Sequence, residues 1–126
     1  MSVMNLPEDA LERIAESAVD ADAASSDCAC TIYAVVNSDG TLARGFRAQS
    51  SQRLATGQYE VRFNRNVRGC AYVASIGLSG AVGASSPGEV TVVGRFGDDR
   101  GVFVTTHNSG GAATDLGFHL AVHCRP

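Results

Sequence analysis

The sequence predicts an all-β protein, an antiparallel β-sandwich or jelly roll, with a short N-terminal α-helix. From residue 30 onward, apolar and polar residues alternate in short runs, which is the period of a strand. Seven or so such runs follow one another at short spacing with turn sequences and no helical period between them, as in sandwiches and jelly rolls. Glycine makes up 14 of 126 residues, about 11% against an average of roughly 7%, and this excess suits a turn-rich β-protein.

Residues 5–22 are predicted to form an amphipathic helix. Asn5 can cap its start, and Pro7 sits where its missing N–H does no harm. A lone helix of this length is marginal in water, so it needs a surface to lie on. The helix could pack on its own domain, associate with copies of itself or dock on a partner, or be a frayed tail. The residues on its apolar stripe are Leu11, Ile14, Ala15, Ala18 and Val19, of which Leu11, Ile14 and Ala18 are the candidate partner contacts.

Charge divides the chain into two regions. Residues 1–27 hold seven acids and one arginine, a net charge of −6, whereas residues 28–126 hold nine arginines and six acids, a net charge of +3. We therefore expect residues 1–27 to be an acidic helix and linker, and residues 28–126 to be a β-sandwich head domain. The excess of +3 is too small and too scattered for a nucleic-acid footprint.

The clearest β pattern runs from Gly57 to Gly77 and predicts a hairpin of two strands joined by a polar turn near Arg65 and Asn66. Side chains alternate on both arms, with the aromatic positions on one face. The final strand, 115–124, alternates in the same way. The predicted core residues are Tyr59, Val61, Phe63, Tyr72, Val92, Phe118, Leu120 and Val122.

The remaining segments follow from turn signals. Residues 30–37 and 41–48 should form one hairpin across Ser38-Asp39-Gly40, and residues 89–96 and 101–108 another. Residues 49–56 are polar and ambiguous. Residues 78–88 and 109–114 are predicted loops.

Composition excludes several functions. The chain has no lysine, which rules out Schiff-base chemistry and a phosphate-binding loop that uses lysine. No apolar run is long enough to span a membrane, and the N-terminus lacks the features of a secretory signal. We expect synthesis in the cytoplasm without a signal peptide, with a role there or in an extracellular or phage-like particle, and no membrane or nucleic-acid partner.

Four cysteines leave the redox chemistry open. Cys70 and Cys124 occupy matching inward positions on two predicted strands and are a candidate disulfide, provided that the strands are neighbours. Free thiols are the alternative, which cytoplasmic synthesis favours. The one-residue spacing of Cys28 and Cys30 does not match the spacing of zinc or redox pairs.

Catalytic and metal chemistry find little support. His119 and His123 share a strand face about 13 Å apart, at 3.3 Å per residue, so they cannot share one ion. In a trimer, one of them could meet its copies on the three-fold axis as a weak metal candidate. The segment from Gly77 to Ala81 lacks the second glycine of a serine elbow. We expect no cofactor and no enzymatic activity.

Four segments, YAVVNSDGTLARG, QYEVRFNRNVRGCAYVASIG, GEVTVVGR and GVFVTTHNSGGAATDLGFHLAVHC, resemble small β-rich head domains of actinobacterial proteins. Similar heads follow collagen-like or tail-fibre-like stalks in phage and phage-like particles. The resemblance covers roughly residues 31–124 and implies a compact β head that forms a homotrimer. It differs here in that an acidic helix replaces the collagen repeat.

We therefore expect a non-enzymatic trimeric module that has a structural or assembly role in a fibre, shell or particle. A protein partner could join it through the N-terminal helix. The alternative is a recognition module that binds a glycan or receptor through residues 78–88 and 109–114.

Overall fold

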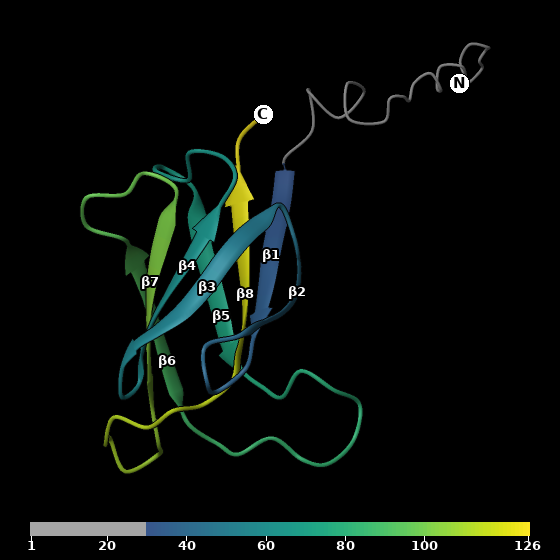
Figure 1. The fold of residues 1–126 in the computed structure, drawn as a ribbon, viewed down its shortest axis with the longest axis vertical. Coiled ribbons are helices and arrows are strands. Elements are labelled where there is room, and N and C mark those ends of the chain that lie inside the picture. The colour runs from purple at the N-terminus through teal and green to yellow at the C-terminus, as the bar shows by residue number, and fades with distance from the viewer. Residues whose placement is uncertain (1–29) are drawn as a thin grey trace, which may run out of the picture. The chain divides into compact units, whose positions relative to one another are not determined.

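Eight strands form two four-stranded antiparallel sheets in the computed structural model, which describes residues 30–126 (Figure 1). The first sheet has the order β2-β1-β8-β5 and the second has the order β3-β4-β7-β6. The all-β prediction is confirmed; the predicted helix, with Leu11, Ile14 and Ala18, lies outside the described residues. The strands are β1 (Cys30–Val36), β2 (Leu42–Phe46), β3 (Ala48–Ala55), β4 (Gln58–Phe63), β5 (Ala71–Ile76), β6 (Glu89–Gly94), β7 (Gly101–His107) and β8 (Phe118–Cys124).

Both sheets lie in one compact unit, Thr31–His123, except for the first residue of β1, Cys30, and the last residue of β8, Cys124. Apart from Val67, the buried apolar side chains within residues 30–126 come from β1 and β8 in the first sheet and from β4 and β7 in the second. At the centre, the rings of Tyr59 and Phe118 meet edge to face with centroids 5.2 Å apart. This geometry places the positive edge of one ring on the negative face of the other. The core therefore lies between the two sheets.

Six of the eight predicted core residues are buried, all of them on β4 and β8. Tyr72 and Val92 are only half-buried, because β5 and β6 are the edge strands of their sheets. The Tyr72 hydroxyl still donates to the Val67 carbonyl oxygen over 2.9 Å. The buried set comprises Tyr59, Val61, Phe63, Phe118, Leu120 and Val122.

The predicted hairpin from Gly57 to Gly77 is wrong. Its two arms became β4 and β5, which lie in different sheets, so the residues between them cross the sandwich instead of turning back. Val67, in the middle of that connection, is fully buried, and its backbone N–H donates to the Asp99 carbonyl oxygen over 2.8 Å. Polar neighbours on both sides of Val67 made this connection look like an exposed turn.

Residues 49–55 of the ambiguous segment 49–56 belong to β3, and the chain also changes sheet just before that strand. β2 ends at Phe46 and β3 starts at Ala48, so Arg47 alone makes the corner. Arg47 has a φ of 63°, and its side chain donates to Asn64 Oδ1 over 3.1 Å. The two other predicted hairpins are confirmed, because β1 pairs with β2 and β6 pairs with β7, both antiparallel.

Candidate functional site

The outer face of the first sheet carries an unusual set of side chains. Cross-strand neighbours share a face of the sheet, so the strand register identifies its members. Val73 lies opposite Ala121 between β5 and β8, and Tyr33 lies opposite Phe46 between β1 and β2. Tyr33, Phe46 and Val73 are all exposed, and Val73 retains 58% of its possible accessible surface. Apolar and small residues thus dominate this solvent-facing surface.

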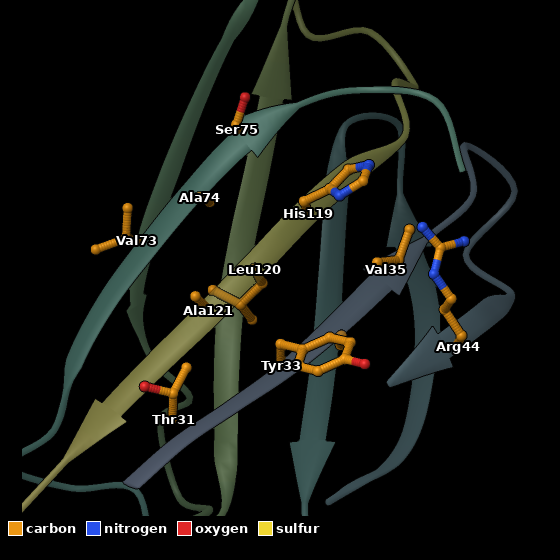
Figure 2. Close-up of a pocket in the computed structure, with 11 residues that line it drawn as sticks. Thr31, Tyr33, Val35, Arg44, Val73, Ala74, Ser75, His119, Leu120 and Ala121 are labelled. Atoms are coloured by element: carbon orange, nitrogen blue, oxygen red, sulfur yellow. The ribbon is translucent and has the colours of Figure 1, made fainter. Parts of the chain in front are cut away.

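A shallow groove of about 590 Å³ runs across that face, as Figure 2 shows. Its lining includes Tyr33 and Val35 from β1, Ala121 from β8 and Val73 from β5. The groove exists because the small side chain of Ala121 lies at the middle of the sheet while larger side chains stand on the flanking strands. Val35 is buried although it belongs to this outer face.

Two polar side chains connect the rim of the groove to the loop at residues 78–88. Arg44 Nη1 donates to the Ser79 carbonyl oxygen over 2.6 Å, and His119 Nε2 lies 2.8 Å from the Leu78 carbonyl oxygen. The short distance to His119 requires that Nε2 carry the proton, because a carbonyl oxygen can only accept. The loop is therefore tied to the sheet at its start, and the rim has a defined shape.

The first sheet is almost free of formal charge. Its four strands contain no aspartate or glutamate, and Arg44 is their only arginine. The second sheet and its connections, in contrast, hold the four ion pairs found within residues 30–126. These are Arg53–Asp115 at 2.8 Å, Arg62–Asp98 at 2.9 Å, Arg68–Asp99 at 3.5 Å and Arg95–Glu60 at 2.6 Å. The two faces of the sandwich thus differ sharply in polarity.

The weak metal candidates His119 and His123 both lie on the outer side of β8. His123 Nδ1 is 2.9 Å from the Thr31 hydroxyl, whereas His119 contacts the Leu78 carbonyl, so each imidazole has its own local partner. Within the described residues, no three His, Cys, Asp or Glu side chains converge so as to hold a metal ion. A site built from three copies of one histidine stays a prediction.

Cys70 and Cys124 are both disulfide-bonded, while Cys30 has a free thiol. The register of β5 with β8 places Ala71 opposite His123. That pairing of strands is the condition on which the predicted Cys70–Cys124 bridge depended. The identity of the bridged partners stays a prediction.

Tyr59 and Asp115 have perturbed pKa values but lie away from the groove. Burial raises the pKa of Tyr59 to about 12, and its hydroxyl donates to the Ser38 carbonyl oxygen over 2.7 Å. A hydrogen bond from the Gly57 backbone N–H lowers the pKa of Asp115, and the adjacent Arg53 lowers it further. Both groups tie loops to strands, which accounts for their environments without catalysis.

The two loops proposed for recognition differ in their attachment. Residues 78–88 are exposed almost throughout, and they border two small hollows of about 140 and 230 Å³. Residues 109–114 fold back on β7 through a bridge between His107 and Ala113. Binding of a glycan or receptor by these loops stays a prediction.

No family model, curated protein or solved structure matches the chain. Within residues 30–126 there is also no helix with the length and hydropathy to cross a membrane. The fold defines the class to which the chain belongs, a two-sheet antiparallel β protein. The exposed residues of this outer face were missed in the sequence because Tyr33, Phe46 and Val73 lie on the side of their strands that faces away from the core.

Proposed function

We propose that this protein is a non-enzymatic assembly module, a β head that forms a homotrimer by burying the outer face of the first sheet against copies of itself. The observation that carries the proposal is the contrast between the two sheet faces. Depletion of charged residues with enrichment of aromatic ones is the compositional mark of an interface core. The first sheet matches that pattern in Tyr33, Phe46 and Val73, and its strands lack carboxylates.

Assembly would also explain why these side chains are exposed in the single chain, because the contact with other copies would bury them. A contiguous apolar patch on a soluble protein usually marks a contact surface. The exposed side of a solvated antiparallel sheet normally carries polar residues, as the second sheet does with Glu60 and Arg62. The first sheet departs from that rule at several neighbouring positions, which favours one contact surface over a set of unrelated exposed residues.

Native mass spectrometry and sedimentation of the full chain test this proposal. We expect a trimer for the natural chain and a shift to monomer for Val73→Glu, because burying an unpaired carboxylate costs about 3 kcal/mol or more at each contact. Val82→Glu is the matched control, since Val82 is an equally apolar and even more exposed residue of the 78–88 loop. A monomeric natural chain, or a trimer that Val73→Glu leaves intact, would refute the proposal.

A further inference from the structure

The tip of the β6–β7 hairpin carries the most exposed large apolar side chain within residues 30–126. Phe96 is 94% exposed, and it follows directly after Arg95, whose backbone N–H donates to the Gly101 carbonyl oxygen over 2.9 Å. Within residues 30–126, no ring contact or cation–π contact engages Phe96, in contrast to Phe103 on the neighbouring strand. Because apolar surface gains free energy when it leaves water, a partner that covers the Phe96 ring would be stabilised by that burial.

Hydrogen bonds order the backbone of the hairpin tip that carries Phe96. Asp98 accepts from the Arg100 backbone N–H over 3.0 Å and from Arg62 Nε over 2.9 Å. Its own backbone N–H donates to the Arg95 carbonyl oxygen over 3.1 Å. Gly97, with a φ of 80°, allows the reversal next to Phe96. The backbone of an ordered turn need not be ordered again on binding, so the entropy cost of seating Phe96 is confined to its side chain.

Symmetry requires two different surfaces for a cyclic trimer. In a ring of three, each contact joins one patch of a subunit to a different patch of the next, since only two-fold contacts are self-complementary. The outer face of the first sheet supplies one patch. The groove at Ala121 is concave and the Phe96 tip is convex, and they come from different sheets of the sandwich.

The chemistry of the two surfaces is complementary. The groove offers the ring of Tyr33 and the guanidinium of Arg44, which suit an aromatic guest through ring–ring and cation–π contacts. The groove strands carry no carboxylate, whereas the hairpin tip presents Asp99, which is 70% exposed and only loosely paired with Arg68 at 3.5 Å. Asp99, close to Phe96 on the hairpin tip, would thus approach the groove rim that carries Arg44.

From these observations we infer that Phe96 of one subunit inserts into the groove of the next, at Tyr33, Val73 and Ala121, and thereby closes the trimer head to tail. This inference rests on the proposed trimer and specifies its contact. Phe96 is then a binding hot spot, an aromatic anchor seated in a pocket. Three identical contacts would be made around the ring.

Two substitutions and one control test the contact in the full chain. We expect Phe96→Asp to weaken assembly by about 30-fold or more per contact, as the loss of a hot spot does. Ala121→Trp fills the groove from the other side and should have a similar effect. Val82→Asp is the control, because it places the same charge on an exposed loop residue outside the contact.

Each outcome separates this inference from the proposed function. Monomers for Phe96→Asp and Ala121→Trp with a trimeric Val82→Asp support the inserted phenylalanine. A trimer that survives Phe96→Asp overturns the inference and leaves the proposed trimer in place, while a monomeric natural chain overturns both.

Cross-linking supplies a readout that does not depend on stability. A photoreactive benzoylphenylalanine at position 96, in a mixture of isotopically light and heavy subunits, should link to peptides of β1, β5 or β8 in the other copy. Intermolecular links that map only to the second sheet would overturn the inference.

Discussion

Replacing Gly57 with alanine should destabilise the fold more than replacing a glycine at which an added Cβ would meet no other atom. Gly57 has a φ of 67°, and an added Cβ would lie 2.6 Å from the Thr106 carbonyl oxygen and 3.0 Å from the Thr114 nitrogen. Hydrogen bonds at both the N–H and the carbonyl of Gly57 oppose a backbone shift that would relieve this contact. Its N–H donates to Asp115 over 2.7 Å, and its carbonyl accepts from the Thr106 N–H over 2.9 Å.

Gly69 provides the matched comparison. Its φ is 79°, but nothing lies within 4 Å of an added Cβ. Alanine at Gly69 should therefore lose only the left-handed backbone preference, about 1–2 kcal/mol. At Gly57 the same loss applies, and overpacking against fixed backbone adds about 1–3 kcal/mol. The expected total at Gly57 is about 2–5 kcal/mol, a large part of a stability of about 5–15 kcal/mol.

Equilibrium unfolding in urea, followed by circular dichroism without reductant, measures both changes. A domain of this size has a slope of about 1–3 kcal/mol per M, so the extra loss in Gly57→Ala should lower the midpoint by about 1 M relative to Gly69→Ala. All variants need the same protein concentration, because association adds to apparent stability. Equal midpoints for the two variants would show that the 2.6 Å contact relaxes freely, and the reasoning would fail.

Two further predictions concern acid stability and the disulfide. Hydrogen bonding by the Gly57 N–H holds the pKa of Asp115 below its ordinary value of 3.8, so the native state binds fewer protons than the unfolded chain. Its stabilising effect is present above pH 3.8 and is lost as the pH falls through the lower native pKa. The urea midpoint of the natural chain should therefore fall more steeply than that of Asp115→Asn between about pH 4 and 2, and parallel profiles would contradict this assignment. Peptide mapping of the unreduced protein should recover Cys70 linked to Cys124, and peptides that link either cysteine elsewhere would show the pairing to be wrong.

Side-chain alternation predicted the strands well but not their neighbours. The pattern of β8 correctly separated Phe118, Leu120 and Val122 from the outward His119 and His123, because the period of two depends only on the local backbone. Which strands pair is decided by contacts far apart in the sequence. The strand order β2-β1-β8-β5 brings the first and last strands together, and no local pattern contains that information.

The error over the Gly57–Gly77 segment has the same origin. A turn and a crossover can have similar polar sequences, and what separates them here is the burial of a single residue, Val67. The candidate site could not be predicted from the sequence for a related reason. Tyr33, Phe46, Val73 and Ala121 are spread over 89 positions from residue 33 to residue 121, and they form a surface only once the order of four strands is known.

The two sheets deal differently with aromatic residues on their outer faces, and this difference argues for assembly. On the second sheet, the guanidinium of Arg95 lies 6.0 Å from the ring centroid of Phe103 and is itself held by Glu60 at 2.6 Å. That aromatic ring is thus covered within one chain by a charged pair that water can solvate. On the first sheet, Tyr33 and Phe46 lie opposite each other and both remain exposed. No carboxylate on the strands of that sheet could pair with an arginine to cover these rings in the same way. Aromatic rings without a charged cover are what a subunit interface requires, because a charged cover would have to be desolvated on assembly.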